Sequence, residues 1–143
     1  MTVRLVETLA KRGCLTISED QTIEALARFL TEHKIGAVPV IDKDGQLSGI
    51  VSERDVVRHM AAAEANYLQQ PVASIMTKQV VTCQITDSAS DMMAAMTNKK
   101  IRHIPIIDDE KQLIGIVSIG DVVSRMIEKY QAETEMMRFY INS

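Results

Sequence analysis

Two Ser-x-x-Asp sequences contain the residues of this chain that are best suited to chemistry. Ser52-Glu53-Arg54-Asp55 and Ser118-Ile119-Gly120-Asp121 each follow a short apolar run typical of a strand and open a segment with helical spacing. A strand-to-helix turn presents free backbone N–H groups, a hydroxyl and a carboxylate together. An aspartate in such a turn can accept two hydrogen bonds from a vicinal diol such as ribose.

The same pattern also has a purely structural explanation. A serine at the N-cap and an acidic residue three positions later form a capping box, and the carboxylate interacts favourably with the helix dipole. Taken alone, each Ser-x-x-Asp sequence favours capping over ligand binding. The strand-to-helix setting is what keeps ligand binding open.

A basic pair that could hold a phosphate, Arg102 and His103, precedes only one of the two motifs. The segment before Ser118 contains Lys99-Lys100-Ile101-Arg102-His103, whereas the segment before Ser52 contains Lys34-Ile35-Gly36-Ala37. Arg102 offers a forked donor, and His103 offers a second donor whose charge changes near neutral pH. The alternative is a solvated helix end, where cations are stabilised by the dipole.

The segments that contain the motifs are copies of each other, offset by 66 residues. Residues 35–57 and 101–123 align without a gap, and 13 of the 23 positions are identical, including Pro39/Pro105 and Gly49/Gly115. A duplicated unit implies a pseudo-twofold molecule with a pair of equivalent clefts where the copies meet. The clefts should differ chemically, because Gly120 stands at the position of Arg54.

Each copy is predicted to contain a strand, a helix, two strands and a second helix. In the first copy these are residues 14–17, a helix with its N-cap at Asp20, strands 38–41 and 47–51, and a helix from Ser52. In the second copy they are residues 80–83, a helix from about 87 to 99, strands 104–107 and 113–117, and a helix from Ser118.

Turns and connectors separate these elements. The first hairpin turn, residues 42–45, ends in Gly45, and the second, residues 108–111, lacks glycine, so a different turn type is expected. Residues 61–70 form a polar connector, and Pro71 can begin a short helix. Residues 127–142 should extend the last helix and pack against the outside of the repeat or another subunit.

Composition excludes several classes of function. The 143 residues carry a net charge of −3, with no Trp, two Phe and three Tyr, which disfavours binding to nucleic acid or to an anionic membrane. No apolar run reaches membrane-spanning length, and the amphipathic start contains Glu7, unlike a secretion signal.

Cys14 and Cys83 suggest buried thiols in a reducing compartment, so a cytoplasmic location is expected. The sequence contains no P-loop, metal-ligand spacing or nucleophile elbow, so no enzyme activity is expected.

Together, these features resemble a tandem pair of CBS domains (cystathionine β-synthase-type domains, a Bateman module) over about residues 1–126. The resemblance rests on an extended start with a threonine, a strand of the form x-x-h-P-h-h-D, the turn Gly-Ile-Val-Ser-x-x-Asp, and the presence of all three twice in order. It implies an α/β (α+β) fold of two βαββα repeats, with sheets flanked by helices and related by a pseudo-twofold axis. The expected organisation is a first repeat with an N-terminal helix and connector over 1–70, a second repeat over 71–128 and a helical extension over 129–143.

The resemblance also implies clefts that bind adenosyl ligands such as AMP, ADP, ATP, NAD or S-adenosylmethionine, with one ligand contacting both repeats. By position, the ribose would be held by Asp55 and Asp121 with Ser52 and Ser118, and Thr16 and Thr82 would lie beside the nucleoside. The adenine slots would be lined by Ile35, Gly36, Ala37, Val38 and Pro39, and by Ile101, Arg102, His103, Ile104 and Pro105. Arg54, Arg102 and His103 would reach phosphate, with Gly120 as the departure at the second copy.

Two functions follow as hypotheses. The first is a regulatory module that senses adenine nucleotides without metal, forms a homodimer and acts on a separate partner protein, with one strong and one weak or empty cleft. The second is a ligand-independent scaffold in which the Ser-x-x-Asp sequences are only capping boxes.

Overall fold

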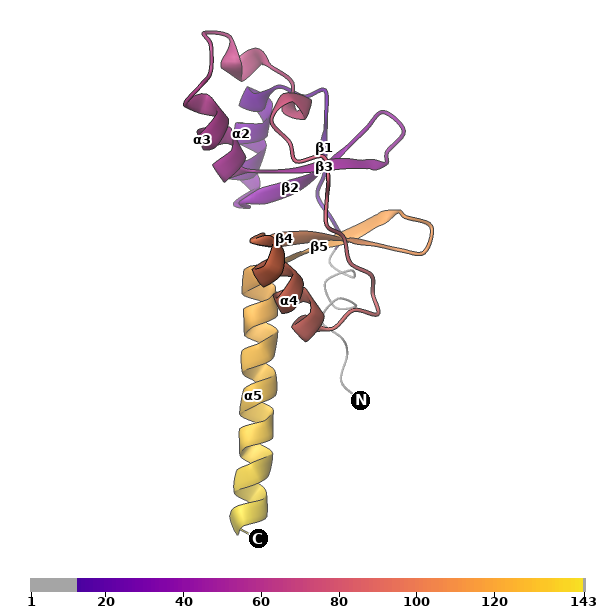
Figure 1. Ribbon diagram of the computed structural model, residues 1–143, viewed down its shortest axis with the longest axis vertical. Coiled ribbons are helices and arrows are strands. Elements are labelled where there is room, and N and C mark those ends of the chain that lie inside the picture. Colours follow the sequence, from indigo (N-terminus) through magenta and orange to yellow (C-terminus); the bar gives the residue numbers. More distant parts are fainter. Residues whose placement is uncertain (1–12, 143) are drawn as a thin grey trace.

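The computed structural model describes residues 13–142, which form two similar halves joined by a connector (Figure 1). The first half contains β1 (Ile17–Ser18), α2 (Ile23–His33), β2 (Ala37–Ile41), β3 (Leu47–Ser52) and α3 (Glu53–Met60). The second contains α4 (Ala89–Lys99), β4 (His103–Ile107), β5 (Leu113–Ser118) and α5 (Ile119–Asn142). The two sheets face each other, and the helices lie on their outer sides (Figure 1). The predicted mixed fold of two βαββα repeats is confirmed.

The 66-residue offset recurs in the strand pairing. In the first half β1 runs parallel to β2 and pairs Ile17 with Val40, and β2 runs antiparallel to β3. In the second half β4 and β5 pair in the same antiparallel register, and a single parallel bridge from Cys83 to Ile106 stands where β1 would be. The expected strand over 80–83 is thus reduced to this bridge.

Each half has its own aliphatic core. Val38, Val40 and Val51 project from one side of the first sheet onto Ile23 and Leu26 of α2. The equivalent cluster of the second half consists of Cys83, Met92, Met96, Ile104, Ile106, Val117 and Val122. Alternation along a strand sends every second side chain to the helices, so the intervening residues face the other half.

The first helix does not begin where the sequence suggested. Asp20 is not the N-cap; Thr22 is, and its hydroxyl accepts a hydrogen bond from Ala25 N at 3.1 Å. The backbone N–H of Asp20 instead donates to Ser18 Oγ within the preceding turn. α2 ends at Lys34 in the left-handed conformation, and α4 ends the same way at Lys100.

The expectation that the two hairpin turns differ is wrong. Gly45 N donates to Asp42 O and Lys111 N donates to Asp108 O, both at 3.0 Å. Asp42 Oδ1 and Asp108 Oδ1 each accept two backbone N–H bonds in the same pattern. Lys111 has a positive φ of 63°, close to the φ of 78° at the equivalent Gly45. The side-chain bonds of the aspartate therefore impose the turn even without glycine.

Replacing Lys111 with glycine should stabilise the protein by about 0.5–1 kcal/mol. The substitution removes the strain of a lysine in the left-handed conformation, and this gain is larger than the extra conformational entropy that glycine loses on folding. Equilibrium urea unfolding measures the difference. Asp109→Gly is the matched control, since Asp109 lies in the same turn without a positive φ and the substitution should destabilise. A destabilised Lys111→Gly variant would contradict this explanation.

The connector between the halves is held by the first half. It contains two short 3₁₀ helices, η1 (Tyr67–Gln69) and η2 (Val72–Ser74), and Pro71 lies directly before η2 as expected. Thr77 then pairs with Ile50 of β3 through two backbone hydrogen bonds of 2.8 and 3.0 Å. The expected N-terminal helix lies outside the described residues.

The last helix is one continuous element of 24 residues, so the expected extension over 127–142 is confirmed. It projects well beyond its own half (Figure 1). Within residues 13–142, no helix has both the length and the apolar character needed to cross a membrane.

Candidate functional site

The fold brings each Ser-x-x-Asp turn beside the start of the neighbouring strand. Ala37 pairs with Ser52 in the β2–β3 ladder, and His103 pairs with Ser118 in the β4–β5 ladder. The first N–H of each following helix donates across this junction, from Glu53 N to Gly36 O at 2.9 Å and from Ile119 N to Arg102 O at 2.8 Å. The expected ribose-holding and phosphate-facing residues of each repeat therefore meet at one end of its hairpin.

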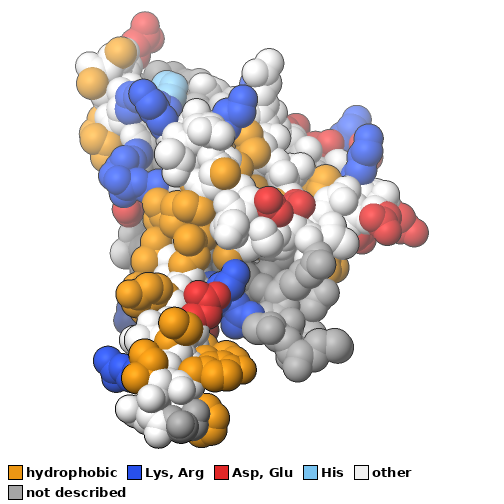
Figure 2. Space-filling view, turned by 60° about the horizontal axis from the view of Figure 1, so that its bottom comes forward, with side chains coloured by type: hydrophobic (Ala, Val, Ile, Leu, Met, Phe, Trp, Pro, Cys, Tyr) orange, Lys and Arg blue, Asp and Glu red, His pale blue; other side chains and the backbone are white. Residues whose placement is uncertain are grey.

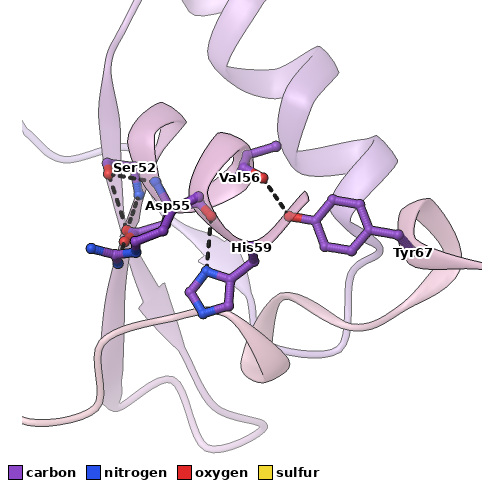
Figure 3. A network of polar contacts seen from close by, with 6 residues as sticks. Ser52, Asp55, Val56, His59 and Tyr67 are labelled. Atoms are coloured by element: carbon purple, nitrogen blue, oxygen red, sulfur yellow. Dashed lines mark hydrogen bonds and ion pairs between the residues drawn. The ribbon is translucent and has the colours of Figure 1, made fainter. Parts of the chain in front are cut away.

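Both Ser-x-x-Asp sequences form complete capping boxes. Ser52 donates from its backbone N–H and its hydroxyl to Asp55 Oδ2 at 2.8 and 3.0 Å, and Asp55 N donates to Ser52 Oγ at 3.3 Å (Figure 3). Ser118 and Asp121 repeat the pattern at 3.0, 2.9 and 3.2 Å. Each carboxylate is thus held in one orientation at the strand end.

Asp55 lies in a wider polar network, drawn in Figure 3. It is 8% exposed, and its Oδ1 forms an ion pair with Arg58 Nη2. His59 Nδ1 lies 2.9 Å from Asp55 O, and the Tyr67 hydroxyl donates to Val56 O at 2.6 Å. Burial, aided by the Asp55 charge, raises the pKa of the Tyr67 hydroxyl.

Sequence reasoning missed Arg58. Residues three apart on a helix are neighbours, so the Asp55/Arg58 spacing was the available signal. The equivalent position in the second copy is Ser124. The Asp55/Arg58 pair is therefore not repeated at the same spacing in the second copy.

His103 lies at the meeting point of the two repeats. Burial lowers the pKa of its imidazole, the Arg102 charge lowers it further, and the Asp121 and Glu53 carboxylates oppose the shift. Glu53 belongs to the first repeat, and its Oε1 lies 3.6 Å from the position that a Cβ on Gly36 would occupy. Charges from both halves thus act on the same imidazole.

The unliganded protein should lose stability in acid through His103. Its pKa in the unfolded chain is near 6.5, and the folded pKa is lower, so the unfolded chain binds the proton first as the pH falls. The His103 contribution is complete above pH 6.5 and is lost as the pH falls through the folded pKa. Unfolding measured from about pH 8 to pH 5 should show a shallower acid loss for His103→Gln, by at most about 1.4 kcal/mol per pH unit. Exposed His33 provides the control: if His33→Gln flattens the profile equally, His103 is not the cause.

The other expected site residues are less uniform in position. Thr16 directly precedes β1. Thr82 directly precedes Cys83, whose backbone N–H donates to Pro105 O at 3.0 Å. Pro39 and Pro105 are both buried. The side chains of Val38 and Ile104 are wholly buried in the two cores, which leaves only their backbone groups for a ligand. Ile35 and Ile101 pack against the cores, whereas Arg54, Arg102 and Gly120 are exposed.

The two cysteine thiols and the possible metal ligands are further candidates for reactive groups. Burial raises the pKa of the Cys14 thiol to about 11 and that of Cys83 to about 12, so both thiols stay protonated at neutral pH. Across the described part of the chain, no group of three His, Cys, Asp or Glu side chains could hold a metal ion.

Comparison with known proteins shows what the chain is similar to. The family model described as "CBS domain" matches residues 6–62 and 72–128. The CBS domain-containing protein CBSX3, mitochondrial, from Arabidopsis thaliana is 34% identical over 131 residues, which cover 89% of this chain and 63% of that relative. The chain thus spans less than two thirds of that relative's length.

Solved structures show the same similarity. The CBS-domain containing protein ATU1752 from Agrobacterium tumefaciens is 41% identical with a TM-score of 0.76, covering 84% of this chain and 90% of its own. The CBS domain pair of protein MJ0100, in complex with 5′-methylthioadenosine and S-adenosyl-L-methionine, is 26% identical with a TM-score of 0.77, covering 90% and 99%. CBSX2 in complex with AMP is 20% identical with a TM-score of 0.75, covering 90% and 99%, and shares the fold.

Proposed function

This chain belongs to the CBS domain family, and from that membership we propose that it is a regulatory module that binds an adenine nucleotide between its two repeats. The proposed ligands are AMP, ADP, ATP or NAD, whose levels report the energy or redox state of the cell. The module would pass this signal to a separate partner protein.

The observation that carries the proposal is the paired, pre-oriented carboxylates of Asp55 and Asp121. Each has one oxygen fixed by two serine donors, and a carboxylate offers about four acceptor positions in all. The ribose hydroxyls would bond to the remaining acceptor positions of a carboxylate that is already held in orientation, and at Asp55 they would share Oδ1 with Arg58. The ligands of MJ0100 both contain adenosine, so a related CBS pair supports adenosyl recognition.

The two clefts are proposed to be unequal, with the stronger one at Asp121. Arg102 and His103 stand beside this aspartate and supply donors for phosphate. At Asp55 the equivalent positions are Gly36 and Ala37, whose side chains offer no donors for phosphate.

The proposal includes a homodimer formed by outer helix faces. Val57 and Met60 of α3 are 66% and 50% exposed, and their equivalents Val123 and Met126 of α5 are 40% and 39% exposed. Apolar faces related by internal symmetry suit isologous pairing with a second copy.

Thermal unfolding with a ligand panel tests the proposal. A ligand at a hundred times its Kd adds about 2.7 kcal/mol to the free energy of unfolding. AMP, ADP, ATP, NAD or S-adenosylmethionine should raise the Tm by several degrees, whereas ribose-free adenine at the same concentration should not. No shift with any member of the panel at millimolar concentration would overturn the proposal.

A ligand-independent scaffold is the second candidate, and the completeness of both capping boxes favours it. In that case each aspartate contributes only about 1 kcal/mol of capping stability. The two candidates differ in one measurable property: an adenosyl ligand stabilises the nucleotide-binding module against unfolding and does not stabilise the scaffold.

A further inference from the structure

The C-terminal helix presents an apolar stripe that continues beyond the residues matched by the family model. The family match ends at residue 128, whereas α5 continues to Asn142. Large apolar side chains of this distal part are open to solvent, with Met137 62% and Tyr140 73% exposed. Hydrophobic side chains gather along the length of the helix in Figure 2.

The spacing of the stripe is that of a two-helix seam. Val123, Met126, Tyr130, residue 133, Met137 and Tyr140 follow one another at alternating steps of three and four residues. This alternation is the a/d pattern in which one helix packs its side chains into the gaps of another. Position 133, in the middle of the seam, is occupied by Glu133.

Glu133 selects the direction of pairing. In a parallel pair, the d-position Glu133 would face Glu133 of the partner subunit, and two apposed carboxylates repel each other. In an antiparallel pair centred between residues 131 and 132, Glu133 lies opposite Tyr130 of the partner subunit. That hydroxyl can donate to the carboxylate, and neither charge meets its like.

The same register matches the rest of the seam. It places Met126 opposite Met137 of the partner subunit, and Val123 opposite the partner's Tyr140. A groove of about 390 Å³ lies at this end of the seam, lined by Met93, Val123, Met126, Ile127, Tyr130 and Gln131. In this register the C-terminal tip of the partner helix lies at this groove. The tip carries the exposed side chains of Tyr140 and Ile141.

We propose that α5 pairs antiparallel with α5 of a second copy, with the tip of each helix seated in the groove between α4 and α5 of the other. The pairing rests on the proposal above that the protein is a homodimer, but it uses the α5 face alone, leaves the α3 face outside the interface and requires no nucleotide.

Cysteine cross-linking without nucleotide tests this pairing. In a Cys14→Ser background, Met126→Cys combined with Met137→Cys should give covalent dimers on mild oxidation, because the register brings these positions together. Each single substitution should remain largely unlinked, since two copies of the same position lie about 16 Å apart along the pair. Within one helix the two cysteines are equally far apart, so linkage reports a second chain.

Each outcome is decisive. Dimers from both single variants would show parallel pairing, and an unlinked double variant that is folded would exclude this register. Sedimentation adds an independent readout: Met137→Lys should shift the protein toward monomer, and Ala132→Lys, on the opposite face of the helix, should not. A dimer unaffected by Met137→Lys would also overturn the proposal. Failure of nucleotide binding would leave every one of these results unchanged.

Discussion

Asp121→Ala is expected to abolish most of the nucleotide-induced rise in Tm. Each hydrogen bond to a charged group contributes about 1.5–3 kcal/mol, so losing the two ribose hydrogen bonds should weaken binding at least about a hundredfold. Isothermal titration with the best ligand of the panel measures the change. The free energy of unfolding without ligand should fall by only about 1 kcal/mol, the value of a capping interaction.

The second repeat itself offers a matched control. Ser88 and Asp91 form the same capping box at the start of α4, with bonds of 3.0 and 3.1 Å, but away from the strand-to-helix turn. Asp91→Ala should therefore cost similar stability and leave nucleotide affinity unchanged. Equal affinities for the Asp121→Ala and Asp91→Ala proteins would show that Asp121 only caps its helix.

Gly49→Ala is expected to be the most destabilising small substitution in the first repeat. A Cβ at Gly49 would lie 2.7 Å from Met76 Sδ and 2.8 Å from Thr77 O. The Thr77 carbonyl cannot yield cheaply, because Thr77 is bonded to Ile50 through both its N–H and its C=O. Overpacking of this kind costs about 1–3 kcal/mol, and we expect about 3 kcal/mol, or roughly 10 °C in Tm.

Gly36→Ala provides the comparison. The nearest atom to its added Cβ is Glu53 Oε1, at an ordinary contact distance of 3.6 Å. This substitution should leave Tm within a few degrees of the original protein, when both are measured by calorimetry. A Gly49→Ala protein as stable as Gly36→Ala would mean that the connector does not pack tightly on β3.

The offset of 66 residues made most of the fold predictable. Helices α2 and α4, and strands β2 and β4, begin and end at positions related by that offset, because the same apolar spacing recurs in both copies. What failed was the choice between nearby polar side chains. Asp20 and Thr22 are both acceptable N-caps, and only the path of the preceding turn, where Asp20 N bonds Ser18, decides for Thr22.

The prediction of a different turn type over residues 108–111 was wrong for a related reason. Glycine content suggested a difference, but the bonds of Asp108 to Glu110 N and Gln112 N specify the same conformation as Asp42 does. The strain at Lys111 is smaller than the stabilisation from those bonds. Composition rules omit such local side-chain contacts.

The candidate site was predictable in outline and not in detail. The sequence motifs placed Asp55 and Asp121 at strand ends, and the structure brings His103 beside Asp121 as the ladder requires. The pairing of Arg58 with Asp55 depends on which rotamer each side chain adopts. The approach of Glu53 to His103 depends on how the two repeats face each other, which no local pattern encodes.

The central claim is that one fold supplies two ribose-holding carboxylates in unequal settings. Native mass spectrometry of the full chain with each member of the ligand panel at millimolar concentration tests this most directly, because it reports the number of chains and of bound ligands together. We predict dimers that carry one tightly held adenosyl ligand per chain, lost in Asp121→Ala and retained in Asp91→Ala. Folded dimers that carry no member of the panel, or that bind the best one equally well after Asp121→Ala, would contradict the claim.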